Sequence, residues 1–152
     1  MRRDDMLRGV ELNVKTQANA LLNAILRHAS FSQMVAVSTQ YEVIVDENNY
    51  TIPSPTTADN LAKILEEKDP LIIFLNLKLL PKWKKRENIS NYKEFLHSPY
   101  SLICLITDVR CVEIYVKDAA VLDEILKIAQ QLEISDIKLK DESDGRNSFS
   151  IM

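Results

Sequence analysis

The sequence predicts a single α+β domain over residues 1–152, with a mixed, mainly antiparallel sheet of about five to seven strands and helices packed on it. Segments with strand-like alternation and segments with apolar residues at helical spacing follow one another along the chain. The length of 152 residues suits one domain, and 46% hydrophobic and 27% charged residues are usual for a globular protein. No repeat, low-complexity tract or long linker divides the chain.

The first half of the chain reads as strands separated by two helices, after residues 1–6, which we expect to form a flexible N-terminus. Strands are expected at residues 7–14, 34–45, 49–52 and 71–80. Helices are expected at residues 17–29 and 58–68. Thr16 is a suitable N-cap for the first helix, and Thr56 with Asp59 resembles a capping box for the second. The last strand of this half is apolar on both faces and becomes half polar at Asn76 and Lys78, as expected of an interior strand that emerges toward solvent.

The second half of the chain continues with two helices around a hairpin. Ser90 is the expected cap of a short helix over residues 90–98, and Asp118 is the expected cap of the clearest helix in the chain, which reaches residue 134. The hairpin strands are expected at residues 101–108 and 111–117. After a strand at 136–140 and a turn at "SDG", a final extended segment is expected at 146–151.

The predicted core lies between the sheet and the helices that begin near residues 17 and 119. Its expected members are Leu22, Ile25, Leu26, Ile73, Leu75, Ile103, Leu105, Ile114, Val116, Ile125 and Leu132. On the strand of residues 111–117, Glu113, Tyr115 and Lys117 project away from the core-facing Ile114, so we expect these three at or near the surface. They are interpreted as the solvated side of a half-buried sheet, with a partner-binding face anchored by Tyr115 as the alternative.

Composition argues against several function classes. A net charge of −3 and a pI near 5.4 do not suggest a surface built mainly for nucleic acid, so a nucleic-acid partner is not expected. Gly9 and Gly145 are the only glycines, which excludes glycine-rich phosphate-binding loops. No apolar run approaches the ~20 residues that span a bilayer, and no secretory signal is found, so we expect a cytoplasmic protein without membrane contact.

The cysteines and histidines lack the spacing of a reactive or metal-binding motif. Cys104 and Cys111 are interpreted as reduced, structural thiols, because burial in an apolar strand makes a thiol unreactive. His28 and His97 fall near the expected C-terminal ends of helices, where the helix dipole favours an imidazolium. Without a His-x-x-x-His or Cys-x-x-Cys pattern, we expect no metal site and no cofactor, and we assign no catalytic residue.

The acidic stretch "DESDG" at residues 141–145 has the composition of a calcium-binding loop but not its spacing. Lys140 and Ile151 stand where the first and twelfth ligands of such a loop must be carboxylates. The stretch is therefore interpreted as a turn. Asp144 with Arg146 is a candidate clamp for an anion or another ligand.

One basic loop combines cations with an aromatic ring that could stack on a base. It consists of Lys82, Trp83, Lys84, Lys85 and Arg86. We favour a solvated loop whose Trp83 folds back onto the core. Nucleic-acid contact through these five residues is the alternative.

The stretches "NYKEFLHSPYSLICLITDVRCVEIYVKD" (residues 91–118) and "DGRNSFSI" (residues 144–151) resemble a small family of uncharacterised bacterial proteins, mostly from Gram-positive spore-formers and their relatives. The shared order is a Tyr-x-x-Phe helix, a serine, an apolar strand ending in Asp, a "VEIYVKD"-like strand leading into a helix, and a terminal Asp-x-Arg. The resemblance covers most of residues 7–151, and Pro99 with Tyr100 departs from it. It implies no activity and no site residue.

Three functions are compatible with these patterns. A non-catalytic protein-interaction or regulatory module, for example an immunity-type partner of a toxin, is favoured because no catalytic motif is found. A small-ligand-binding protein or hydrolase would need a polar pocket near Asp144, Arg146 and Lys117. Nucleic-acid binding through the loop of residues 82–86 is the third. A homodimer through the strand-forming residues 33–45 is also expected, since exposed edge strands pair unless protected.

Overall fold

The structure is a computed structural model, and it describes residues 7–141 and Phe149. Its strands are β1 (Leu7–Asn13), β2 (Val35–Val45), β3 (Asn48–Asn49), β4 (Thr56–Thr57), β5 (Leu71–Leu80), β6 (Leu102–Thr107), β7 (Cys111–Val116) and β8 (Asp136–Asp141). Its helices are α1 (Asn19–Arg27), α2 (Ala58–Lys68), α3 (Tyr92–Leu96) and α4 (Ala119–Gln131). These elements confirm the predicted α+β fold.

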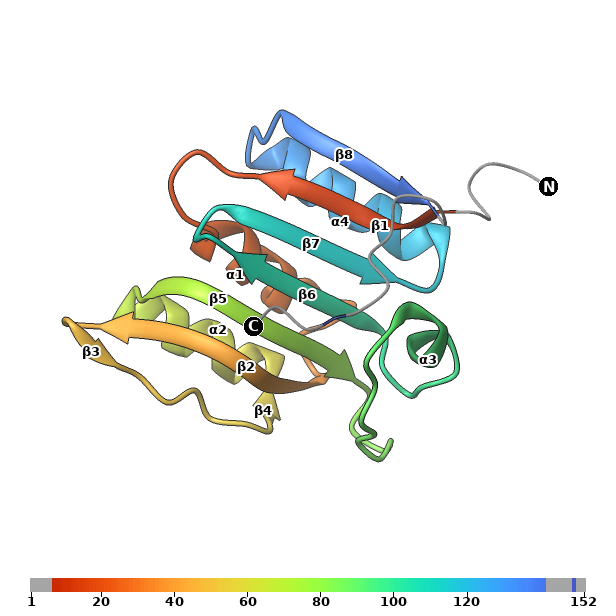
Figure 1. Ribbon diagram of the computed structural model, residues 1–152, viewed down its shortest axis with the longest axis horizontal. Helices are drawn as coiled ribbons and strands as arrows, with labels where there is room; N and C mark the ends of the chain where they lie inside the picture. Colours follow the sequence, from red (N-terminus) through yellow and green to blue (C-terminus); the bar gives the residue numbers. More distant parts are fainter. Residues whose placement is uncertain (1–6, 142–148, 150–152) are drawn as a thin grey trace.

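The eight strands form one sheet in the order β3-β2-β5-β6-β7-β1-β8, and β4 pairs with β2 outside this path. Every pairing among the described strands is antiparallel, where the sequence left room for parallel pairs. The number of described strands exceeds the expected five to seven because it includes β3 and β4, which have only two residues each. In Figure 1, α1, α2 and α4 lie together behind the sheet, and α3 lies beside the end of β5.

Three helices, α2, α3 and α4, have a side-chain cap that holds one of their first backbone N–H groups. The predicted cap of α4 is confirmed, since the Asp118 carboxylate accepts a hydrogen bond from the N–H of Val121 at 2.9 Å. The predicted cap of α2 was one residue early. Thr57, whose backbone is extended, accepts from the N–H of Asn60 at 3.1 Å, whereas the hydroxyl of Thr56 accepts from the side chain of Asn60.

The predicted caps of the other two helices were wrong. The N-cap of α1 is Ala18, which has no side chain to accept a hydrogen bond, so Thr16 lies outside the helix. The N-cap of α3 is Asn91, which accepts from the N–H of Glu94 at 2.9 Å. Ser90 instead donates its N–H and its hydroxyl to the Glu94 carboxylate, each at 2.8 Å.

The main core lies between the sheet and α1, α2 and α4, as predicted. The expected core residues that are buried there are Leu22, Ile25, Leu26, Leu75, Ile114, Val116 and Ile125. Two expectations were wrong: Leu132 is the C-cap of α4 and is 38% exposed, and Ile73 is only partly buried. In β5 the buried position belongs to Ile72, because an irregularity in the pairing with β2 shifts the alternation at this end of the strand.

The opposite face of the sheet is also covered, which the sequence did not predict. A second cluster of buried side chains consists of Val37, Leu80, Tyr92, Phe95, Tyr100, Ile103, Leu105, Tyr115 and Phe149. Ile103 and Leu105 are therefore core residues as expected, but they face away from α1 and α4. The cover comes from α3, the loops around it and Phe149.

This cover corrects the expected surface row on β7. Tyr115 is fully buried and Glu113 is 5% exposed, and only Lys117 is exposed as predicted. The Tyr115 ring packs against Tyr92 and Phe149, with ring centroids 6.1 and 5.3 Å away, and its hydroxyl donates to the Glu113 carboxylate at 2.6 Å. Tyr115 therefore cannot anchor a partner at the surface.

The edge formed by β2 is lined by the chain segment that follows it. β3 and β4 pair with the two ends of β2, and between them the Ser54 hydroxyl accepts from the N–H of Ser38 at 3.0 Å. The homodimer expected through residues 33–45 stays a prediction. No helix in the described part of the chain is long and apolar enough to cross a membrane.

Candidate ligand-binding groove

A groove of about 630 Å³ opens on the second face of the sheet. β2 contributes Val37 and Thr39 to its lining, and β5 contributes Asn76 and Lys78. The segment of residues 86–90 lines it from the loop before α3, together with Tyr100 and Phe149. Residues far apart in the sequence thus meet here because antiparallel pairing places β2 beside β5, and the loop folds over both.

Lys78 lies at the base of this groove and is 5% exposed. Its ammonium Nζ donates to Oδ1 of Asn76 at 2.7 Å, and Nδ2 of Asn76 donates to the carbonyl of Phe149 at 3.1 Å. The N–H of Phe149 donates to the carbonyl of Ser90 at 2.9 Å. Among the described residues, Lys78 forms no ion pair with a carboxylate.

Burial lowers the pKa of Lys78 to about 8, because the ammonium loses hydration without gaining a negative partner. Near neutral pH the side chain is therefore mostly a cation, with a fraction present as neutral amine. A group whose pKa is shifted by burial and which lies in a groove is a candidate functional residue. The other charged residues in the lining are Arg86 and Glu87.

The lowered pKa predicts how the stability of the protein responds to pH. In the unfolded chain the pKa of this lysine is near 10.4. Between about pH 8 and pH 10 the unfolded chain therefore binds more protons at Lys78 than the folded chain does. The contribution of Lys78 to the free energy of unfolding consequently rises with pH in this range. We expect Lys78→Met to be more stable than the wild type by about 2–3 kcal/mol at pH 7 and by less at pH 9.5. Urea unfolding of both proteins at the two pH values measures this, and a stability difference that is the same at both would contradict the prediction.

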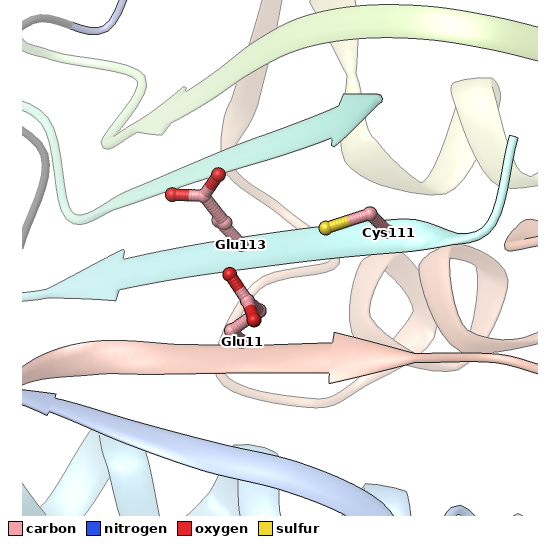
Figure 2. Close-up of side chains that lie close together, drawn as sticks. All are labelled: Glu11, Cys111 and Glu113. Carbon is pink, nitrogen blue, oxygen red and sulfur yellow. The ribbon is translucent and has the colours of Figure 1, made fainter. Parts of the chain in front are cut away.

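A second polar cluster lies on the same face, at the β1–β7 pairing. Figure 2 shows Glu11 projecting from β1 and Cys111 and Glu113 from β7, and their potential ligand atoms lie within 4.8 Å of one another. The two glutamates oppose each other in register, which is unfavourable without compensation. The Lys140 ammonium at 3.5 Å from Glu11 and the Tyr115 hydroxyl on Glu113 supply that compensation, so we assign no ligand to this cluster.

The two cysteines lie on opposite faces of the sheet and are free thiols. Cys104 is buried in the helix-facing core, and burial, with a contribution from the charge of Glu113, raises its pKa to about 12. The buried position of Cys104 is as predicted, and its lack of reactivity stays a prediction. The Cys111 thiol is partly exposed, and burial raises its pKa as well.

We expect Cys104 to be unreactive toward Ellman's reagent in the native protein at pH 8, and Cys111 to react slowly, because the thiolate is the attacking species. Both thiols should react at once in guanidinium chloride. The absorbance of the released nitrothiobenzoate counts the reacted thiols, and rapid reaction of two thiols without denaturant would contradict the buried position of Cys104.

The structure places the remaining sequence candidates as follows. Asp144 and Arg146, and the rest of the "DESDG" turn beyond Asp141, lie outside the described residues. Lys117 donates to the carbonyl of Ser98 at 2.5 Å and lies over the Phe95 ring, and partial burial lowers its pKa.

Both histidines lie at the C-terminal ends of helices, as predicted, where they are the C-caps. His28 ends α1 and His97 ends α3. The Nδ1 atom of His28 accepts from the N–H of Ser30 at 3.1 Å and lies 3.9 Å from the Glu124 carboxylate. These contacts give the imidazole of His28 a structural role.

The basic loop of residues 82–86 is exposed throughout. The expectation that Trp83 folds back onto the core was wrong, since its side chain is 81% exposed. The N–H of Lys84 donates to the carbonyl of Pro81 at 3.1 Å, which closes a turn and leaves Trp83 at its tip. Arg86, Lys85 and Lys84 line a hollow of about 440 Å³ beside Pro55 and Leu80, and Arg86 also lines the groove above Lys78.

Sequence reasoning missed Lys78 and Asn76 as site residues. Their polar character in an apolar strand was interpreted as emergence toward solvent, yet they are 5% and 4% exposed. The available signal was that both residues point to the same face of an interior strand, two positions apart. A buried lysine in that position needs a partner or a function.

Comparisons with known proteins agree with the predicted resemblance. A family model described as "Protein of unknown function (DUF2691)" matches residues 7–150. The uncharacterized protein YncE of Bacillus subtilis (strain 168) is 32% identical over 80 residues, and the match covers 52% of this chain and about half, 52%, of that protein. No solved structure matches. Because the family model covers nearly the whole chain, the protein belongs to the DUF2691 family.

Proposed function

We propose that the protein binds a small anionic ligand in the groove above Lys78. The observation that supports this proposal is the buried ammonium of Lys78, which forms no ion pair with a carboxylate among the described residues. Burying a charge without a partner costs several kcal/mol, and an apolar side chain at this position would avoid that cost. A bound carboxylate or phosphate would supply the missing partner. The groove volume of about 630 Å³ is within the range of small-molecule sites.

The surroundings of Lys78 also favour an anion. Arg86 lines the same groove and presents a guanidinium that can bind a carboxylate or phosphate through two hydrogen bonds. Lys84 and Lys85 extend the positive charge into the adjoining hollow, and clustered charge of one sign raises the local concentration of the opposite ion. Thr39 and Ser90 add hydroxyl groups that can donate to ligand oxygens.

Thermal unfolding tests this function. The Tm is measured at constant ionic strength with inorganic phosphate, with acetate and with adenosine monophosphate. At saturating concentration we expect at least one of them to raise the Tm of the wild type by roughly 5–10 °C, because a ligand that binds only the folded state stabilises it by about 2.7 kcal/mol at a hundredfold excess over Kd. Lys78→Met should abolish the shift. Lys127→Met, which removes an exposed lysine from α4 on the far side of the sheet, should retain it. No shift with any of the three, or equal shifts in wild type and Lys78→Met, would refute the proposal.

Protein interaction through the basic loop is a second candidate function, favoured by the 81% exposure of Trp83 among four cations. Exposed tryptophan and arginine side chains are frequent binding hot spots, and the surrounding lysines would select an acidic partner. A photo-crosslinking amino acid at position 83, used in the source cells, tests this. A crosslinked protein that disappears when Lys82, Lys84 and Lys85 are changed to glutamate supports the interaction. Crosslinked RNA or DNA would indicate nucleic-acid binding instead, and the absence of any crosslink would argue against both.

A further inference from the structure

We infer that Lys78 is a nucleophilic amine that forms an imine with the carbonyl group of a small oxo acid bound in the groove. This inference rests on the proposed anion-binding function, because the carboxylate of the oxo acid is the anionic group. It adds a chemical class of ligand and a covalent role for one residue.

The position of the Lys78 amine suits such a reaction. It faces a groove large enough for a small molecule, and the side-chain oxygen of Asn76 holds one of its N–H groups at 2.7 Å. In the described part of the chain no carboxylate pairs with it and fixes it as an ammonium. Burial with a pKa of about 8 makes its neutral fraction at pH 7 on the order of a hundredfold larger than that of an ordinary lysine. Lysines activated by desolvation in this way are the ones that form imines with carbonyl substrates.

Two other lysines of this face, Lys140 and Lys117, have different partners. Lys140 is 8% exposed, and its ammonium lies 3.5 Å from the carboxylate of Glu11. Lys117 is exposed and donates to the carbonyl of Ser98. A nearby carboxylate favours the protonated form of a lysine, which is not nucleophilic. Among these three, Lys78 alone combines burial, a groove and the lack of an ion-pair partner among the described residues.

The reaction needs no oxidant or reductant. The neutral amine of Lys78 attacks the carbonyl carbon, the N–C bond forms, and the π electrons of the C=O bond move to the oxygen. The oxygen takes up a proton from water in the open groove while the nitrogen gives one back to that water, which yields a carbinolamine. The nitrogen lone pair then expels the hydroxyl group, which takes up a second proton from the solvent and leaves as water, and the second N–H proton passes to the solvent. The C=N double bond remains. Arg86 in the groove lining can donate hydrogen bonds to the carboxylate of the oxo acid. Glu87 is the charged hydrogen-bond acceptor of the lining.

Glyoxylate, the smallest aldehyde with a carboxylate, is the probe for this reaction. The wild-type protein is incubated with glyoxylate and sodium cyanoborohydride at pH 7.5. The cyanoborohydride reduces the imine to a stable carboxymethyl amine. Peptide mass spectrometry then measures the modification of each lysine. We expect Lys78 to be modified at least about tenfold faster than any exposed lysine, since its neutral fraction is larger. Acetaldehyde, which lacks the carboxylate, should show a smaller preference for Lys78. Excess inorganic phosphate should slow the modification of Lys78 by glyoxylate.

The outcomes separate this inference from the proposed function. Preferential modification of Lys78 that phosphate slows supports the inference, and modification spread evenly over the lysines overturns it. If an anion still raises the Tm of the same preparation, the anion-binding proposal stands although the imine does not form. Lys78→Arg cannot form an imine, so we expect it to give no adduct at position 78. The measurements on the wild type decide the matter if this variant fails to fold.

Discussion

Replacing Ile114 by aspartate is expected to remove a large part of the stability of the protein. Ile114 is fully buried at the middle of β7, where it pairs with Val10 of β1 and Cys104 of β6 in the helix-facing core. A carboxylate at this position would have no hydrogen-bond partner or counter-charge, and the cost is more than about 4 kcal/mol. That is a large part of the 5–15 kcal/mol that usually separates folded from unfolded states.

Circular dichroism during heating and urea titration measures the effect of Ile114→Asp. Ile114→Val is the matched control, because it removes one methylene group from the same place and should cost only about 1 kcal/mol. A Tm for Ile114→Asp within a few degrees of the wild type would mean that β7 does not face the core as described.

Gly9→Ala is expected to be the most damaging small substitution in the sheet. Gly9 lies in β1 opposite Tyr115 of β7, next to an irregularity in the pairing with β8. A Cβ atom at this position would overlap the carbonyl oxygen of Ile114 and lie 3.0 Å from the Cα of Tyr115. These are backbone atoms, so two strands would have to move apart, and we expect a loss of about 3 kcal/mol or more.

We expect the Tm of Gly9→Ala to be roughly 10 °C lower than that of the wild type. Circular dichroism during heating measures the Tm. Asn13→Ala on the same strand is the control, because Asn13 is exposed and the substitution removes atoms without adding any. Equal Tm values for the two variants would show that β1 and β7 have room for a side chain at position 9.

The elements that the sequence predicted well are those whose pattern is local. The expected helix at residues 58–68 and the expected strand at residues 71–80 coincide with α2 and β5, since apolar spacing and nearby caps determine both. The β6–β7 turn was harder. Asp108 and Val109 take positive φ values of 50° and 68°, a conformation usual for glycine and uncommon for a β-branched residue. The turn geometry and the strand register could therefore not be predicted from these residue types.

The candidate site could not be predicted because it depends on contacts between distant segments. The alternation of β7 correctly separates Ile114 from Glu113 and Tyr115, but whether the second face meets water depends on α3 and on Phe149. The same holds for Lys78. A half-polar strand has the same sequence pattern when its polar residues meet solvent as when they line a groove. Only the placement of residues 86–90 over β5 shows that the polar residues of β5 line a groove.

The position of β1 in the sheet constrains the order in which the protein can fold. β1 is the first strand among the described residues, yet its two neighbours are β7 and β8, formed by residues 111–116 and 136–141. β2, β5 and β6 lie side by side and come from residues 35–107, so that part can assemble while β1 has no partner. Contacts between residues so far apart in sequence form slowly, because a long loop must close before they are made. On the ribosome, β1 therefore waits for nearly all of the described chain to be synthesised before it can enter the sheet.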